Sequence, residues 1–573
     1  MKTNIVITAL LVLVALTTFG QSNIADTYWR NEQTGDWQIG FAEKHVIYNN
    51  KVWEIVSQTE KKDGYTLTVD NGDVIKVGKM KNGLRSIAIG KGKAVVCSQI
   101  TTATLPDYPT EDLTPFKDNG YRAGDTATIV GWLKDCPKEV LDQNREFDIE
   151  ATSLFSRKDF NAYGKIDSLG RFTVKMPVEN TQEVYMDWER TTLRTVLEPG
   201  ETYFFLHDYK TGQQLFMGSN ARVQNELLTH DIRQESAQLD RQGMTDQKVI
   251  DYKDRWADIY ERNNARLDSV IMYHPTLSRR YEDYQRMDML CEMASDVMQA
   301  MCFIKGWKLP VAVTSYVESQ VWQSNRMKKP YTMVRNFSWV LYYYHMNAQH
   351  TNPLMAEVDM IDSLYADPLL RETCKARMLN ELIDATRTPL TERYMAIANQ
   401  IQHPAIRQGV LSLNDRYLAI QQRDISKTQS LKTNDDLAGM SDGEQILRKI
   451  TEPYRGRLVL VDVWGTWCSP CKEALSHSKE EFERLKDFSL VYFYLANRSE
   501  DEAWKNVIKE YDLTGDDIVH YNLPTDQQSA VEHFLNVHAF PTYKLIDRDG
   551  TVLDVNADPR DLESLARLLE KLK

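Results

Sequence analysis

Apolar and polar residues alternate along the first part of the chain, in short segments such as Tyr65–Val69 and Val74–Val77. This period of two is typical of half-buried β-strands. Dipeptides that favour tight hairpin turns separate the segments: Asn49-Asn50, Asp63-Gly64, Asn71-Gly72 and Asn82-Gly83. The pattern therefore predicts a small antiparallel β domain over residues 23–105, as a sheet or a barrel.

A second set of alternating segments follows a linker rich in Pro, Asp and Thr at residues 106–118. The predicted strands include Thr126–Leu133, Phe147–Phe155, Arg171–Met176 and Thr202–His207. Short strands at this spacing, with turns at Gly170 and Pro199-Gly200, predict a β-sandwich-like domain over residues 119–219.

From residue 220 onward the apolar positions recur with the period of a helix. One clear stripe has its members three or four positions apart, with one adjacent pair: Met287, Leu290, Met293, Ala294, Val297 and Met301. We interpret this Met-rich stripe as core packing rather than as a cofactor site. The pattern predicts a helical region over residues 220–438, with prolines near the helix boundaries.

The last segment, residues 441–573, alternates buried strands with amphipathic helices. The predicted elements are strands Leu458–Val463 and Leu490–Leu495, helices Lys472–Lys486 and Glu500–Tyr511, a hairpin of Thr542–Ile546 with Val552–Val555, and a closing helix Asp561–Leu572. Such alternation predicts an α/β sheet covered by helices. The fold class expected for the whole chain is multidomain α+β, with two antiparallel β domains, a helical middle region and this α/β domain.

Composition narrows the function. A chain of 573 residues is long enough for several domains, at roughly 100–200 residues each. The 69 basic and 82 acidic residues give a net charge of −13, which argues against a nucleic-acid partner, because phosphate binding needs a basic surface. Seven cysteines in so long a chain do not make a disulfide scaffold.

The N-terminus has the pattern of a secretory signal peptide. Lys2 is followed by the apolar run Ile5–Leu16, and the small residues Thr18 and Gly20 fit a cleavage site before Gln21. The run is short for a membrane span, which takes roughly 20 residues. We therefore expect residues 1–20 to be removed, and the mature protein to be exported to the periplasm or cell envelope and soluble there.

Two of the cysteines, Cys468 and Cys471, lie three positions apart between a buried strand and the start of a helix. The reactive form of a thiol is the thiolate, and the N-terminus of a helix stabilises negative charge. We therefore expect a lowered pKa for Cys468, and a more buried Cys471 that stays protonated until it resolves a mixed disulfide. Ser469 and Pro470 form the turn between them, and Pro470 stiffens it.

Other interpretations of this Cys-x-x-Cys motif were weighed. Half of a zinc site needs a second Cys or His pair with suitable spacing, and none is found. A haem attachment needs His after the second cysteine, where this chain has Lys472. A structural, inert disulfide stays open as an alternative. We expect no metal and no cofactor at the site.

The sequence Trp467-Cys468-Ser469-Pro470-Cys471 after an apolar strand resembles the thioredoxin superfamily, and the exported context resembles its TlpA-like branch. The resemblance implies that Asp462 is the buried acid that relays the proton of Cys471. It also implies a cis bond before Pro541, with Phe540 and Trp467 in contact with substrate. Segments 196–201 and 216–219 resemble a β domain found ahead of thioredoxin modules in exported Bacteroidetes-type proteins.

The chain departs from the TlpA-like pattern after the second cysteine. Members often carry Glu three residues and Pro five residues beyond it, where this chain has Ala474 and Ser476. We therefore expect the helix after the motif to lack the proline kink, and no role is assigned to Glu473.

We therefore hypothesise that the protein is an exported thiol-disulfide oxidoreductase. The sequence does not show whether it reduces or oxidises its substrates. Its partners would be protein thiols or disulfides in the cell envelope, together with a separate redox partner protein. An envelope binding or scaffold protein with an accessory thioredoxin-like domain is the alternative. The remaining cysteines are expected to be buried structural thiols: Cys97, Cys136, Cys291, Cys302 and Cys374. The sequence does not predict their pairing or the oligomeric state.

Overall fold

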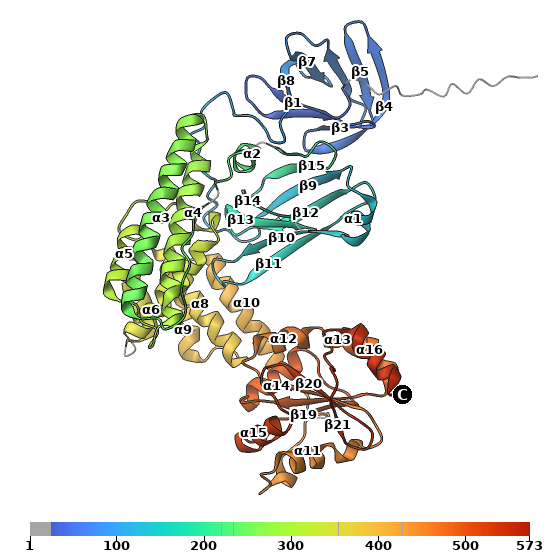
Figure 1. The fold of residues 1–573 in the computed structure, drawn as a ribbon, viewed down its shortest axis with the longest axis vertical. Helices are drawn as coiled ribbons and strands as arrows, with labels where there is room; N and C mark the ends of the chain where they lie inside the picture. The colour runs from blue at the N-terminus through green and yellow to red at the C-terminus, as the bar shows by residue number, and fades with distance from the viewer. Residues whose placement is uncertain (1–23, 190, 219, 233, 353–354, 427) are drawn as a thin grey trace, which may run out of the picture. The chain divides into compact units, whose positions relative to one another are not determined.

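The computed structural model describes residues 24–189, 191–218, 220–232, 234–352, 355–426 and 428–573 (Figure 1). The predicted signal peptide, residues 1–20, lies outside the described residues. The chain divides into two compact units, one up to Met360 and one from Ile361 onward. The division falls inside helix α7 (Glu357–Leu364), so the expected helical region contributes to both units.

The first unit begins with a closed antiparallel barrel in which each strand pairs with the next and β1 pairs with β8. Its strands are β1 (Thr27–Asn31), β2 (Trp37–Phe41), β3 (His45–Tyr48), β4 (Lys51–Lys61), β5 (Gly64–Val69), β6 (Val74–Gly78), β7 (Leu84–Ile89) and β8 (Val95–Ile100). Asn49 and Asn50 join β3 to β4 with positive φ angles of 51° and 58°, which a two-residue hairpin of the I′ type requires. The turn chemistry in the sequence thus marks this hairpin.

Two four-stranded sheets follow, in the orders β11-β10-β13-β14 and β12-β9-β15-β16. Their strands are β9 (Thr126–Lys134), β10 (Glu146–Thr152), β11 (Asp159–Lys165), β12 (Arg171–Pro177), β13 (Gln182–Trp188), β14 (Thr191–Leu197), β15 (Thr202–Asp208) and β16 (Gln213–Met217), with helix α1 (Lys138–Gln143) after β9. Phe147 and Phe172, from different sheets, stack with ring centroids 4.0 Å apart in the core between them. One pair differs from the antiparallel expectation, because β9 and β15 run parallel.

The helices of the first unit are α2 (Ala221–Thr229), α3 (Asp246–Tyr273), α4 (Arg279–Gln299), α5 (Val311–Val321) and α6 (Asn336–Thr351). Helix α4 packs against α3, α5 and α6, and the whole predicted stripe from Met287 to Met301 is buried. The stripe is therefore core. Within the described ranges, none of the helices combines the length and the apolar character that crossing a bilayer requires.

The second unit starts with three helices, α8 (Pro368–Thr386), α9 (Glu392–Gln400) and α10 (Pro404–Gln421). Helix α10 packs against α8 and also against α14 (Asp501–Glu510) of the domain that follows. These helices therefore share a compact unit with the last domain.

The last domain has a five-stranded sheet in the order β19-β18-β17-β20-β21. Its strands are β17 (Val459–Trp464), β18 (Val491–Ala496), β19 (Ile518–Tyr521), β20 (Thr542–Ile546) and β21 (Val552–Leu553), and its other helices are α11 (Gly443–Thr451), α12 (Ser469–Ser476), α13 (Ser478–Leu485), α15 (Thr525–Phe534) and α16 (Leu562–Lys571). Strands β17, β18 and β19 run parallel, and β20 and β21 run antiparallel to their neighbours. Helices α12, α13, α14 and α16 cover one face, and α11 and α15 the other (Figure 1).

The expectation of one helix without a kink over residues 472–486 was wrong. The helix ends at Ser476, and His477 has φ −96° and ψ 3° before α13 begins at Ser478. The N–H of His477 bonds to the carbonyl of Ala474, and the Ser476 hydroxyl donates to the carbonyl of Glu473 at 2.6 Å. These local bonds replace the helical pattern, so the break needs no proline.

Candidate functional site

The two cysteines lie where β17 ends and α12 begins. Cys468 is the N-cap of α12, and it forms a disulfide with Cys471. The N–H of Cys471 donates to Cys468 Sγ at 3.1 Å. Both residues are almost fully covered in this oxidised form, at 3% and 1% exposure. We expected Cys471 to be the more buried of the two, but in the disulfide state their exposed fractions differ little.

The first turn of α12 suits a thiolate at Cys468. Ser469 and Pro470 are the first two helical residues, and the missing N–H of Pro470 is not needed in a first turn, where those groups lack helical partners. The N–H of Cys471 already points at the Cys468 sulfur. When the disulfide is reduced, this N–H and the helix dipole both stabilise negative charge at Sγ.

An aromatic pair lies beside the cysteines. The rings of Trp467 and Phe540 meet edge to face with centroids 5.2 Å apart. Phe540 packs against the core cluster that contains both cysteines, and the bond from Phe540 to Pro541 is cis. Pairing of Thr542 with Val463 places this segment next to the end of β17. The structure thus brings the predicted residues of the motif and the distant Pro541 segment together.

Two residues that sequence reasoning missed hold Trp467 in place. The Trp467 ring is 52% exposed, yet its Nε1–H donates to the carbonyl of Asn497 at 3.1 Å. A Cβ on Gly465 would lie 2.6 Å from Trp467 Nε1 and 3.0 Å from that carbonyl. Only glycine therefore leaves room for the indole, and the signal for this was a glycine two positions before Trp467.

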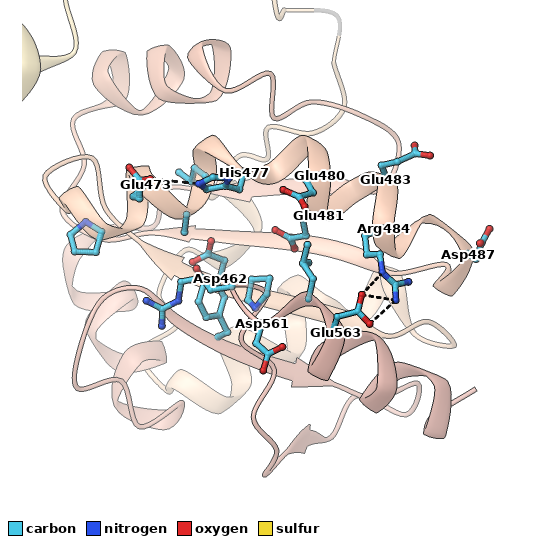
Figure 2. Close-up of a pocket in the computed structure, with 17 residues that line it drawn as sticks. Asp462, Glu473, His477, Glu480, Glu481, Glu483, Arg484, Asp487, Asp561 and Glu563 are labelled. Carbon is cyan, nitrogen blue, oxygen red and sulfur yellow. Dashed lines mark hydrogen bonds and ion pairs between the residues drawn. The ribbon is translucent and has the colours of Figure 1, made fainter. Parts of the chain in front are cut away.

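Asp462 lies in β17 with its side chain buried, and its Oδ1 has no hydrogen-bond partner among the described residues. Burial, reinforced by the charge of Glu481, raises the pKa of Asp462 well above its ordinary value. It lines a cavity of about 1130 Å³ (Figure 2). Pro470, the residue before Cys471, lines the same cavity. A carboxyl placed in this way can exchange a proton near neutral pH.

Glu481 is a second acid in this cavity, and sequence reasoning did not find it. It projects from α13 into the space that Asp462 also faces (Figure 2). Burial, with a smaller contribution from the charge of Asp558, raises the pKa of Glu481 to about 8. In the sequence it belongs to the charged run 479–484, which has the pattern of a solvated helix face. Only the fold shows that this run borders a cavity and that Glu481 is less exposed than the other acids of the run.

The other cysteines are all free thiols in the structure. Cys97, Cys291 and Cys374 are buried, and Cys136 and Cys302 are partly buried. Burial raises the pKa of Cys97 to about 12 and that of Cys374 to about 11. Such thiols are poor nucleophiles, so thiol chemistry concentrates on Cys468 and Cys471.

Comparison with known proteins supports this geometry for the last domain. Residues 456–552 match a family model described as thioredoxin-like. Over 119 residues the chain is 29% identical to the thiol-disulfide oxidoreductase ResA of Bacillus thuringiensis subsp. konkukian. This match covers 21% of this chain and 65% of ResA. It is 24% identical over 119 residues to the thioredoxin-like protein YneN of Bacillus subtilis, covering 20% and 65%. The predicted resemblance to the thioredoxin superfamily is confirmed for the C-terminal domain.

Among solved structures, a putative thiol-disulfide oxidoreductase from Bacteroides vulgatus is 27% identical, with 21% of this chain and 78% of that chain covered and a TM-score of 0.18. The thioredoxin domain of another thiol-disulfide oxidoreductase from Bacteroides vulgatus is 22% identical, with coverages of 21% and 84% and a TM-score of 0.19. Scores this low add nothing to the sequence match. The chain spans 65% of the first curated relative, so its activity has to be argued from its own residues.

Proposed function

We propose that this protein is an exported thiol-disulfide oxidoreductase that exchanges disulfides with proteins of the cell envelope. The observation that carries the proposal is the Cys468–Cys471 disulfide at the start of α12. A disulfide between two positions of one helical turn closes a very short loop, so it constrains little of the unfolded chain. Its position at a helix N-terminus instead favours reversible opening.

In the reductive direction the exchange takes two steps. The Cys468 thiolate attacks one sulfur of a substrate disulfide, which forms a mixed disulfide and releases the first substrate thiolate. The Cys471 thiolate then attacks Cys468 Sγ, which closes the intramolecular disulfide and releases the second thiolate. Two electrons pass to the substrate, and a separate redox partner protein restores the dithiol. The same steps reversed oxidise a substrate, and the partner's potential sets the direction.

The proton of Cys471 leaves through the cavity behind α12. Asp462 accepts it when the Cys471 thiol becomes a thiolate, because burial raises the pKa of Asp462 well above its ordinary value and makes it a stronger base. Glu481 faces the same cavity, and its pKa of about 8 allows it to pass the proton on toward solvent. Asp462 is thus the base, and Glu481 extends its route to water.

The aromatic pair and the Pro541 segment form the binding edge. Trp467 and Phe540 offer an exposed apolar contact beside the reacting sulfur. The backbone at Phe540 is the expected partner for an extended substrate segment, because β-type pairing brings a disulfide close to Cys468 without selecting one sequence.

Export and envelope partners are tested with a Cys471→Ser variant of the full chain expressed with its own N-terminus. This variant cannot complete the second step, so mixed disulfides through Cys468 should accumulate in the envelope fraction and disappear on reduction. The control Cys302→Ser leaves the motif intact and should accumulate none. Retention of residues 1–20 and of the whole protein in the cytoplasm would contradict the proposed location, and absence of mixed disulfides would contradict the proposed exchange.

A further inference from the structure

Three side chains of the first unit converge, outside the compact unit that carries the redox site. Asp107 lies in the segment after the barrel, and His230 and His274 follow the last residues of α2 and α3. His230 Nε2 lies 2.9 Å from Asp107 Oδ1, and His274 Nδ1 lies 2.6 Å from Asp107 Oδ2. The two imidazole rings have centroids 4.1 Å apart. One nitrogen or oxygen of each residue lies within 4.8 Å of the others.

The backbone on all three sides of this cluster is held by its own bonds. The N–H groups of His230 and His274 end their helices by donating to the carbonyls of Glu226 and Val270. The Tyr281 hydroxyl donates to the His230 carbonyl at 2.6 Å. The backbone at these residues is therefore fixed by hydrogen bonds outside the cluster. Such preorganisation favours a binding site.

The segment that carries Asp107 is held in the same way. The Arg30 guanidinium donates to the carbonyls of Pro106 and Asp107 at 3.2 and 2.7 Å. The Thr229 hydroxyl, next to His230, donates to the carbonyl of Leu105 at 3.0 Å. The backbone that carries the Asp107 carboxylate is therefore held in place, and the carboxylate oxygens face His230 and His274.

We infer that Asp107, His230 and His274 bind one divalent transition-metal ion of the zinc class. Two imidazole nitrogens and one carboxylate oxygen are the donors that Zn²⁺ prefers when no cysteine takes part. Bond lengths of about 2.0–2.1 Å separate neighbouring ligands of a tetrahedral Zn²⁺ by about 3.3 Å. The distances of 2.9 and 2.6 Å go to different oxygens of Asp107, and the three ligand atoms all lie within 4.8 Å of one another. Shifts of about 1–1.5 Å therefore bring one carboxylate oxygen and both nitrogens to this spacing.

A fourth ligand has room beside the cluster. A cavity of about 10 Å³ lies against Asp107, His230 and Thr229, which is about the space that one water molecule needs. The inferred ion therefore has three protein ligands and one water. It joins the segment after the barrel to the ends of α2 and α3.

Sequence spacing did not reveal this site, and the expectation from the sequence was that no metal is bound. The ligands come from three separate elements, with 123 positions between Asp107 and His230 and 167 between Asp107 and His274. Metal motifs that are read from a sequence depend on ligands a few positions apart. The inference also stands apart from the proposed redox function, since no residue of the C-terminal domain takes part.

The test is zinc titration of the full oxidised chain after removal of metal with EDTA. Without reductant Cys468 and Cys471 stay in their disulfide and cannot bind zinc. We expect one zinc ion per chain, and an affinity at least about 10-fold lower in both His230→Gln and His274→Gln. His350→Gln, an exposed histidine near the end of α6, is the matched control and should bind as the wild type does.

X-ray absorption of the zinc-loaded wild type gives a readout that does not depend on any variant. Two imidazole nitrogens and additional oxygen ligands are expected in the first coordination shell. If a histidine variant fails to fold, this spectrum alone decides between a bound ion and a purely hydrogen-bonded cluster. Failure of the wild type to bind zinc stoichiometrically, a shell without imidazole, or full affinity in folded variants of both histidines would overturn the inference.

Discussion

Glu481 is a partly buried acid among exposed charged residues of α13. Its effect on the free energy of unfolding can be tested by changing the pH. Its pKa of about 8 in the folded state exceeds the ordinary 4.5. Between these values the unfolded chain loses the proton while the folded chain keeps it, so stability falls as pH rises from about 4.5 to about 8. We predict that Glu481→Gln is more stable than the wild type by about 1–2 kcal/mol at pH 8, after allowance for water in the cavity, and by little at pH 5.

Urea unfolding at the two pH values measures this difference. Glu480→Gln is the matched control, because Glu480 lies on the same helix and lines the same cavity but is exposed, and it should show no such pH-dependent gain. An equal effect of both substitutions, or a gain that does not grow with pH, would refute an inward, proton-holding Glu481.

Asp462 is predicted to act on the second step alone. In Asp462→Asn the Cys471 thiol loses its base, and we expect that resolution of the mixed disulfide slows by about 100-fold at pH 7. The loss should shrink near pH 9, because a thiol of ordinary pKa near 8.5 then ionises without help. Stopped-flow measurement of both steps checks this, and a uniform slowing of the first step as well would point to a general structural defect.

Gly465 is predicted to set the position of Trp467. In Gly465→Ala the new methyl group displaces the indole from the Asn497 carbonyl, so we expect kcat/KM for a disulfide peptide to fall several-fold with the disulfide itself intact. Gly515→Ala is the control, since its Cβ would meet Ile518 at an ordinary 3.5 Å. Unchanged kinetics in Gly465→Ala would mean that Trp467 takes no part in binding.

At the scale of residues, the local motif predicted the two cysteines and their turn, and the family resemblance added Asp462, Phe540 and Pro541. Residues that neither source marks were missed. Cys468, Cys471 and Pro470 were readable because a strand, a short turn and a helix follow one another in the chain. Glu481 was not, because a charged helix face looks the same whether one of its members points to water or into a cavity. Asp107 and its two histidines meet only through long-range packing.

At the scale of helices, we predict that the packing of α8 and α10 depends on one carboxylate of α14. Glu510 accepts from Arg416 at 2.8 Å and lies 3.4 Å from Arg387, and it is 4% exposed. Arg387 in turn has a left-handed φ of 55°, and its carbonyl accepts from Asn506 at 2.9 Å. Removal of the negative charge leaves the mostly buried guanidinium of Arg387 with the more distant Asp384, at 4.0 Å, as its remaining counter-charge.

We therefore expect Glu510→Gln to lower the free energy of unfolding of the second unit by about 2–4 kcal/mol. Hydrogen exchange should quicken in α8–α10 before it quickens in the sheet. Asp501→Asn is the control, because Asp501 is an exposed carboxylate of the same helix that pairs with Lys505 of that helix. If exchange in α8–α10 stays at the wild-type rate in Glu510→Gln, these helices do not rely on α14.

Element boundaries show where sequence patterns suffice. The strand after α13 and the closing hairpin were predicted within one or two residues, because buried strands and an Asp-Gly turn have strong local signals. The break at His477 was missed because the helix ends at a hydrogen bond from the Ser476 hydroxyl to a backbone carbonyl, and not at a proline. Helices α11 and α15 were also missed.

For the whole molecule the compact units divide the helical region differently from the pattern in the sequence. We predict that residues 361–573 fold as an isolated fragment and keep the disulfide-reducing rate of the full chain. A fragment of residues 441–573 lacks α8–α10 and should be less stable, because α14 then exposes its packing face. Thermal unfolding and activity of the two fragments provide the comparison. Equal stability of both would show that the helices belong to no common unit with the domain.

The architecture of the molecule follows from periodicity, since residues that alternate build its two β regions and helical stripes build its bundle. The division near Met360 was not readable, because α6 and α8 have similar helical patterns and differ only in what they pack against. The proposed exchange chemistry occupies the last domain, and the first unit carries a separate candidate metal site.

The central claim is that Cys468 attacks and Cys471 resolves, and one measurement tests it most directly. Reduced full-length Cys471→Ser is mixed with a disulfide-bonded peptide, quenched with acid, and analysed by intact mass and peptide mapping. The account predicts a stoichiometric mixed disulfide on Cys468, none in the Cys468→Ser, Cys471→Ser double variant, and complete peptide reduction without a trapped adduct in the wild type. An adduct on another cysteine, or equal peptide reduction by the double variant, would contradict it.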